Sequence, residues 1–234
     1  MYGFTLYSAP HIIILIICAA ASVCAGIFYR RASRDSQNKT GFLLAVLLVV
    51  LDIAHYIVFY FIGELSVNAI PLHLCAMTIY LILFHSVHLS DWLAQTLYAV
   101  CLPGVWSALL FPNWTMYPIF SYPSLHSFTM HCLMSMYIIM QLTSCRIRPR
   151  LRAIWKPAVF LVVAAAIAWM ANFYLHTNFM FLNRPVPGSP LEPLYNLAGG
   201  ILPLYLLFFG IFAMIVLVIM YLPFSIYNLI RKRR

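Results

Sequence analysis

Charged residues are scarce in this chain of 234 residues: Asp, Glu, Lys and Arg make up 8% of it, whereas soluble domains carry roughly 25%. Hydrophobic residues make up 64% and aromatic residues 16%, which gives far more apolar surface than a disordered chain has. The six cysteines are spread thinly and form no C-x-x-C pair, a pattern that excludes a disulfide-stapled secreted module and carries no zinc signature. These absences leave an integral membrane protein.

Seven apolar segments are long enough to cross a bilayer, which takes about 20 residues each. We therefore expect an all-α membrane protein, a bundle of seven transmembrane helices that forms one polytopic domain over residues 1–234. The expected spans are residues 11–29, 42–63, 71–89, 92–111, 124–144, 155–175 and 199–229. No Lys or Arg precedes the first segment, so we expect a transmembrane span there and not a signal peptide.

Basic residues predict the orientation of the bundle. They form three clusters: Arg30, Arg31, Arg34 and Lys39; Arg146, Arg148, Arg150, Arg152 and Lys156; and Arg231, Lys232, Arg233 and Arg234. With seven spans all three clusters lie on one side, which the positive-inside rule makes cytoplasmic, so the N-terminus is expected outside and the C-terminus inside. The net charge of +9 then lies beside lipid headgroups, and we expect no nucleic-acid partner.

Polar side chains within spans are costly, which makes each of them a functional candidate. The expected topology places eight of them in the outer halves of four spans: Asp52, His55, His73, Cys75, His126, His131, Asn172 and His176. The inner halves look almost purely apolar. Because four spans bring polar groups to one depth, the sequence predicts a single pocket that faces outward.

Spacing predicts which of these groups share a helix face. Asp52 and His55 are three residues apart, and Asn172 and His176 are four apart, so each pair lies on one face, where the carboxylate of Asp52 would orient the imidazole. An isolated histidine in a membrane helix usually makes an interhelical hydrogen bond. Haem ligation by two histidines is allowed, but no other feature favours it, and we expect no metal and no cofactor.

Cys75 is the strongest nucleophile at this depth, although a free cysteine is also a common apolar filler. His73 is two residues away and would not face it on a helix, so a base must come from another span. A neighbouring imidazole converts a thiol into a reactive thiolate, and His131 or His126 is placed to supply it. These two lie five residues apart, about 140° around a helix, so at most one is expected to point at the thiol.

Three segments resemble a known family: Pro71-Leu72-His73-Leu74-Cys75, Met130-His131-Cys132-Leu133-Met134, and Thr177-Asn178-Phe179-Met180-Phe181-Leu182 followed by Arg184-Pro185. Together they resemble the bacterial YwaF-like integral membrane family, a distant relative of eukaryotic transmembrane protein 164, over residues 40–210 or so. The eukaryotic branch transfers acyl groups among glycerolipids through a cysteine and a histidine. The resemblance implies Cys75 and His131 as the matching positions, Asn178 as a further pocket residue, and a multi-pass location in a bacterial plasma membrane.

Two functions from different classes follow. In the first, the protein is a lipid acyltransferase or transacylase: Cys75 attacks an acyl ester, His131 moves the proton, and His73, His55 or Asn172 stabilises the oxyanion. Its partners are membrane lipids, bound also by Asp52, His126, His176 and Asn178. In the second, the same pocket binds a small polar solute or ion and the protein is a carrier. A scaffold protein with no chemistry at these positions is the third possibility.

Overall fold

The structure is a computed structural model that describes residues 3–232. Arg233 and Arg234 of the third basic cluster lie outside the described residues. All regular elements in this part of the chain are helical: α1 Ala9–Arg31, α2 Arg34–Phe61, α3 Leu74–Val87, α4 Asp91–Thr96, α5 Leu102–Leu110, α6 Tyr122–Thr143, α7 Trp155–Leu175, α8 Leu191–Leu197 and α9 Leu202–Lys232. A π-helical turn, η2 Leu97–Cys101, joins α4 and α5 into one helical run.

Within the described residues, six helical runs are long and apolar enough to cross a membrane. They contain α1, α2, α3, α4 with α5, α7, and α9. The sequence predicted a seventh span at residues 124–144, which is α6. That helix has 22 residues, but Ser, Thr, His and Gln side chains lower its hydropathy. Many of these side chains are buried against neighbouring helices, and a helix surrounded by protein does not need an apolar surface on every side.

The helix boundaries agree closely with the expected spans where apolar runs set them. Helix α7 covers the predicted residues 155–175. Helix α2 is the main difference, because it begins at Arg34 instead of residue 42. Ser33 caps it by accepting a hydrogen bond from the Ser36 backbone N–H at 3.2 Å, and Asp35 lies in the first turn, where a negative charge is favourable. The helix therefore extends beyond its apolar part.

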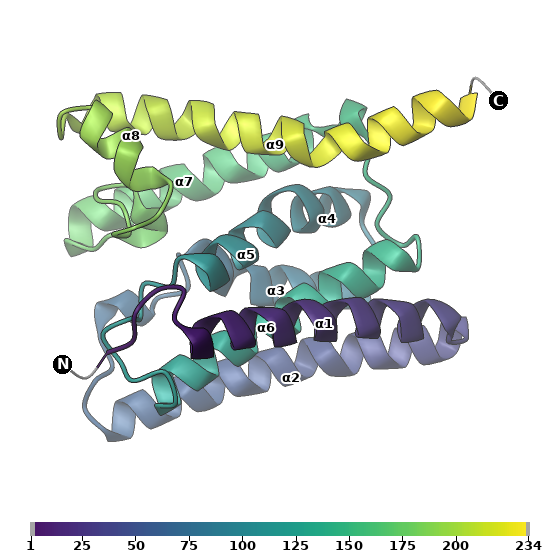
Figure 1. Ribbon diagram of the computed structural model, residues 1–234, viewed down its shortest axis with the longest axis horizontal. Coiled ribbons are helices and arrows are strands. Elements are labelled where there is room, and N and C mark those ends of the chain that lie inside the picture. The colour runs from purple at the N-terminus through teal and green to yellow at the C-terminus, as the bar shows by residue number, and fades with distance from the viewer. Residues whose placement is uncertain (1–2, 233–234) are drawn as a thin grey trace.

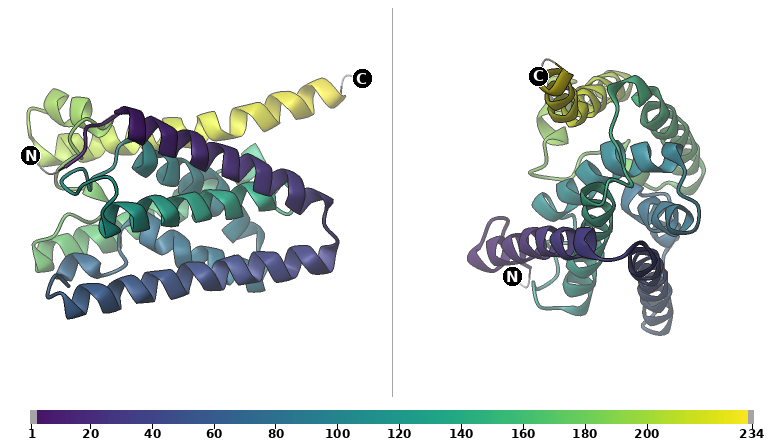
Figure 2. Two further views of the ribbon diagram at one scale, coloured as in Figure 1. Left: turned by 60° about the horizontal axis from the view of Figure 1, so that its bottom comes forward. Right: turned by 90° about the vertical axis from the view of Figure 1, so that its right-hand side faces the viewer.

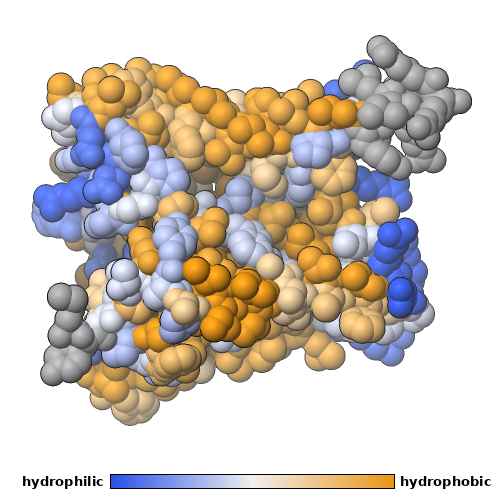
Figure 3. Space-filling view, viewed as in Figure 1, coloured by the Kyte–Doolittle hydropathy of each residue, from blue (hydrophilic) through white to orange (hydrophobic). Residues whose placement is uncertain are grey.

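The helices run roughly along one direction, so that most connections lie at two opposite ends (Figures 1 and 2). We call the end with residues 62–73, 111–121 and 176–201 the loop end. The opposite end, with residues 32–33, 145–154 and the end of α9, is the basic end. Figure 3 shows a mostly hydrophobic band between two more hydrophilic ends. This pattern is typical of a protein whose sides face lipid.

Helix α6 lies at the centre of one half of the bundle, packed against α1, α2 and α5. Hydrogen bonds between side chains join these helices: the Ser22 hydroxyl on α1 donates to the Ser135 hydroxyl on α6 at 2.9 Å, and the Trp106 indole N–H donates to the same oxygen at 3.1 Å. Interhelical bonds of this kind satisfy polar groups away from water.

The expectation that the inner halves are almost purely apolar is wrong. Near the basic end, His85 Nδ1 and the Tyr137 hydroxyl are hydrogen-bonded at 2.9 Å, and the Gln141 amide donates to the Tyr29 hydroxyl at 2.9 Å. Gln95 donates to the Arg148 carbonyl at 2.9 Å. The sequence pattern hid this network because its members come from several helices and are separated by apolar residues.

Helix α9 lies at the edge of the bundle (Figure 1). It packs against α8 near the loop end, and near the basic end against η2 and the short 3-10 helix η3 Leu151–Ala153. At the loop end the Tyr205 hydroxyl donates to the Phe181 carbonyl at 2.9 Å. The middle of the helix lines a cavity.

Candidate active site

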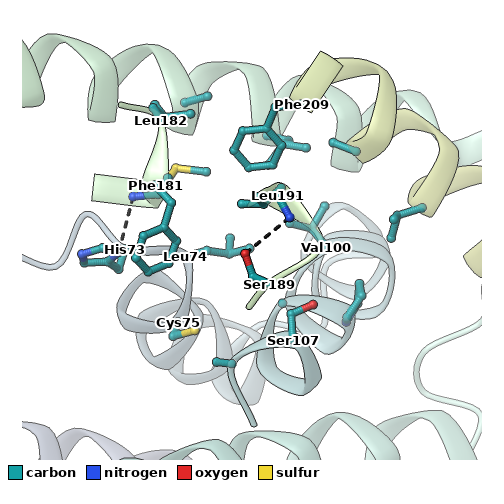
Figure 4. Close-up of a pocket in the computed structure, with 18 of the residues that line it drawn as sticks. His73, Leu74, Cys75, Val100, Ser107, Phe181, Leu182, Ser189, Leu191 and Phe209 are labelled. Atoms are coloured by element: carbon teal, nitrogen blue, oxygen red, sulfur yellow. Dashed lines mark hydrogen bonds between the residues drawn. The ribbon is translucent and has the colours of Figure 1, made fainter. Parts of the chain in front are cut away.

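A cavity of about 1380 Å³ lies between α3, α5, α6, α7 and the middle of α9. It is larger than the roughly 300–1000 Å³ of common small-molecule pockets. Leu, Ile, Val, Ala and Phe side chains form most of its wall, part of which is drawn in Figure 4. On α9 the lining residues Ile211, Met214 and Ile215 are also 50%, 46% and 52% exposed. The cavity is therefore open along α9, on the apolar side of the molecule.

Six of the predicted site residues line this cavity: Asp52, His55, His73, Cys75, His126 and His131. A second cavity of about 270 Å³ adjoins it and shares Asp52, His55, His73 and Ala76. The smaller cavity is also lined by Glu64, Ser66 and Asn68 from the connection between α2 and α3. Among the described residues, neither lining contains Lys or Arg. A polar compartment thus meets a large apolar one at the loop end.

Cys75 is the second residue of α3 and is a free, half-buried thiol. His73 caps the helix with an extended backbone, φ −75° and ψ 144°. Because His73 is outside the helix, the rule that residues two apart point away from each other does not apply, and both line the cavity (Figure 4). Among the described residues, no hydrogen bond between side chains joins the Cys75 thiol to an imidazole.

His131 is held in one tautomer. Its Nδ1 lies 2.6 Å from the Ser127 carbonyl oxygen, one turn earlier in α6. A carbonyl only accepts hydrogen bonds, so Nδ1 carries the proton and Nε2 of the neutral ring is the basic nitrogen. Nε2 is buried and has no protein partner. The Trp114 ring stacks on His131, with centroids 5.3 Å apart, and fixes the plane of the imidazole.

His126 and His55 form a pair. Their rings stack with centroids 4.1 Å apart and an interplanar angle of 9°. His126 Nε2 donates to the Leu51 carbonyl oxygen at 3.3 Å, whereas His55 Nδ1 is buried without a partner. The prediction that Asp52 orients His55 is wrong in this structure, because the Asp52 carboxylate accepts a hydrogen bond from the Tyr80 hydroxyl at 3.2 Å instead.

His73 connects the cavity to the long loop at the loop end. Its Nδ1 accepts a hydrogen bond from the Met180 backbone N–H at 3.4 Å (Figure 4). The Phe179 and Phe181 rings lie 5.4 and 5.2 Å from its own. Because Nδ1 accepts, Nε2 of the neutral ring carries the proton, so His73 presents a hydrogen-bond donor and not a base.

The other three predicted residues do not line the cavity. Asn172 is buried, and its side chain binds the loop: Oδ1 accepts from the Phe179 N–H at 2.6 Å and the Thr177 hydroxyl at 2.9 Å, and Nδ2 donates to the Phe179 carbonyl at 3.0 Å. Asn178 similarly binds backbone groups of Asn183 and Arg184. His176 ends α7 in a left-handed conformation, with φ 52°, and is exposed.

Sequence reasoning missed several polar lining residues, namely Ser107, Asn113, Trp114, Ser127 and Ser189. Ser107 and Ser127 are isolated hydroxyls in apolar helices, and the other three residues lie in connections between helices, so none of them gives a periodic signal. The one available signal in the sequence is Pro103-Gly104, which interrupts an apolar run. This pair follows the π-helical turn η2, whose residues Ala99 and Val100 line the cavity. Such turns occur frequently at functional sites.

Within the described residues, no group of three or more His, Cys, Asp or Glu side chains is arranged to hold a metal ion. The titratable side chains in the lining of the large cavity are the Cys75 thiol, the Asp52 carboxylate and four imidazoles.

Comparison with known proteins assigns the chain to a family. No curated protein and no solved structure matches it. A family model, described as the TMEM164 family, matches residues 6–221. This match includes α1 to α8, most of α9, and all the residues that line the two cavities. The chain therefore belongs to the TMEM164 family.

Proposed function

We propose that this protein transfers acyl groups between membrane lipids, with Cys75 as the nucleophile and His131 as the general base. One observation carries the proposal: the thiol and an imidazole whose basic nitrogen is free line the same cavity, and that cavity is large, apolar and open to the side. The motifs around these two residues support the same assignment, because they resemble acyl-transferring relatives.

The shape of the site fits a lipid. An acyl chain is compatible with the apolar wall, and the opening beside Ile211, Met214 and Ile215 gives it a path from the bilayer that does not pass through water. The ester and headgroup then lie in the polar compartment at the loop end. In the part of the chain that the structure describes, neither lining contains Lys or Arg, so no cationic side chain there is placed to pair with an anionic donor such as an acyl phosphate.

In this proposal acyl transfer takes place in two steps. First, His131 Nε2 takes the thiol proton while the Cys75 sulfur attacks the ester carbonyl; the S–C bond forms, the ester C–O bond breaks, and His131 returns the proton to the departing alcohol. Second, His131 takes a proton from the acceptor hydroxyl as its oxygen attacks the thioester, and the released thiolate recovers that proton. The Nε2–H of His73 is the candidate donor to the oxyanion in both steps.

The thiol and the imidazole do not hydrogen-bond in the structure, so the mechanism requires a side-chain rotation when substrate enters. Catalytic hydrogen bonds commonly tighten only in the complex with substrate. The apolar wall then keeps water away from the thioester, which would otherwise hydrolyse.

We also propose that α6 is a seventh membrane span and that the loop end faces outward. The support is the distribution of Lys and Arg at the basic end, which the positive-inside rule places in the cytoplasm. A bacterial plasma membrane, and kinship with YwaF-like proteins, belong to the same proposal and rest on the sequence motifs alone.

Reconstituted vesicles containing a donor phospholipid with an isotope-labelled acyl chain and an unlabelled lysolipid acceptor test the function. We expect the parent protein to move the label, Cys75→Ala and His131→Ala to lose this activity, and His126→Ala to lose less because its Nε2 is already bound to Leu51. Circular dichroism of each variant checks folding. Equal transfer by Cys75→Ala and the parent would overturn the proposal.

The carrier hypothesis makes the opposite prediction for a substitution of Cys75. A carrier needs the cavity but not the thiol, so Cys75→Ser would keep its full function. The buried network near the basic end does not favour transport, because Gln141, Tyr29 and Gln95 bind groups on other helices and tie the bundle together.

A further inference from the structure

The large cavity ends abruptly toward the basic end. Its last lining residues there are Ala99 on the π-helical turn, Ala158 on α7 and Ile219 on α9. Tyr98 directly precedes Ala99 and Tyr221 lies two residues after Ile219; they are 4% and 0% exposed and do not line the cavity. The cavity therefore stops where α9 packs against η2.

Three aromatic rings pack together beyond the last lining residues, on the side of the basic end. The Tyr98 ring lies 5.8 Å from that of Tyr221 and 5.5 Å from that of Phe224, both edge-to-face. Hydrogen bonds hold the hydroxyls of the two tyrosines: Tyr98 donates to the Met220 carbonyl, and Tyr221 donates to Gln95 Oε1 at 2.9 Å. We call Tyr98, Tyr221 and Phe224 the aromatic floor. Rings held by both packing and hydrogen bonds form a rigid boundary.

The distance to this floor suits an acyl chain. The lining residues of α9 run from Leu206 to Ile219, about 20 Å at roughly 1.5 Å per residue. A single leaflet offers about 15 Å, half of the roughly 30 Å hydrocarbon core. A chain as long as one leaflet therefore fits extended along α9, and only a longer chain reaches the end of the lining where the floor lies.

We infer that the aromatic floor sets the longest acyl chain that the protein accepts, and that the small residues Ala158 and Ala165 on α7 keep the path to it open. This inference rests on the proposed lipid function. Both alanines line the cavity and are half-buried, and they lie about 10 Å apart along the helix. A larger side chain at either position blocks the path, and the one at Ala165 blocks it farther from the floor.

Native mass spectrometry of the detergent-purified protein, incubated with an equimolar mixture of phosphatidylcholines of different chain lengths, tests the inference by binding alone. We expect Ala158→Phe to shift the bound lipids toward shorter chains and Ala165→Phe to shift them further. Phe224→Ala is expected to shift them toward longer chains. Val163→Phe is the matched control, because Val163 is on the same helix, 52% exposed and outside the lining; we expect no shift.

The same measurement in the Cys75→Ala protein separates this inference from the proposed function. Chain-length shifts that persist without the thiol support the floor even if acyl transfer is never observed. Identical distributions in the parent, Ala158→Phe and Ala165→Phe proteins, each with a native circular dichroism spectrum, would overturn the inference while leaving the catalytic proposal intact. Phe224→Ala keeps the inference testable if the α7 variants fail to fold.

Discussion

Replacing Asn172 by alanine should destabilise the protein by several times more than the same change at Asn178. Each side chain makes three hydrogen bonds to the same loop. Asn172 is 3% exposed, whereas two of the bonds of Asn178 lie at the surface. The two residues therefore form a matched pair that differs mainly in burial.

The magnitude follows from the groups left behind. Asn172→Ala removes three bonds with a net worth of about 0.5–1.5 kcal/mol each, so we expect a loss of about 2–4 kcal/mol in the free energy of unfolding. It leaves the buried Phe179 N–H without a partner, and the Phe179 carbonyl keeps only the long bond from the Leu182 N–H at 3.4 Å. At Asn178 water replaces the lost partners, and we expect less than about 1 kcal/mol. The two losses of unfolding free energy differ because water can replace the lost hydrogen-bond partner of an exposed group but not that of a buried group.

Equilibrium unfolding in detergent micelles, followed by circular dichroism, measures both values. The loop carries Met180, whose N–H binds His73, so we also expect Asn172→Ala to reduce acyl transfer. Equal losses at the two positions would refute the reasoning from burial. A parent-like stability with abolished lipid binding would instead assign Asn172 to the substrate, as the sequence predicted.

Two further predictions concern the ends of the bundle. His73→Ala removes the proposed oxyanion donor, so we expect acyl transfer to fall about 10²–10³-fold. A lipid-like alkylating probe should still label Cys75, and a full transfer rate would contradict this role. Tyr29→Phe removes a buried hydroxyl that donates to the Gln37 carbonyl at 2.8 Å and accepts from Gln141 at 2.9 Å. We expect it to lower the free energy of unfolding by about 1–3 kcal/mol and to leave the chain-length preference unchanged. Unaltered denaturation curves would count against this prediction.

The sequence predicted the helices well because long apolar runs determine which segments can cross a membrane. Basic clusters mark the ends of these segments. It predicted α7 at its observed bounds, and it predicted one pocket for His55, His73, Cys75, His126 and His131, all of which line the large cavity. It did not predict their partners. Asp52 binds Tyr80 instead of orienting His55 because the i, i+3 spacing describes one helix, whereas the choice of partner depends on which helix packs opposite.

The same limit explains the two errors about His73 and Asn172. The spacing of His73 and Cys75 was interpreted as helical, but α3 begins only at Leu74, so both side chains reach the cavity. Asn172 looked like a pocket residue because it is polar and near a span end. Its amide instead complements the backbone of Phe179, and this match depends on a loop conformation that no periodicity encodes.

Helix α6 connects the composition of the chain to its proposed chemistry. It carries both His126 and His131, and its hydropathy is too low for it to be counted among the apolar spans. Its polar side chains are tolerated because α1, α2 and α5 pack around it, which removes the cost of exposing them to lipid. The same packing closes direct access to His131 from those sides. In the proposed mechanism a lipid must then reach the imidazole through the cavity beside α9, which is why that proposal needs both the lateral opening and the buried base.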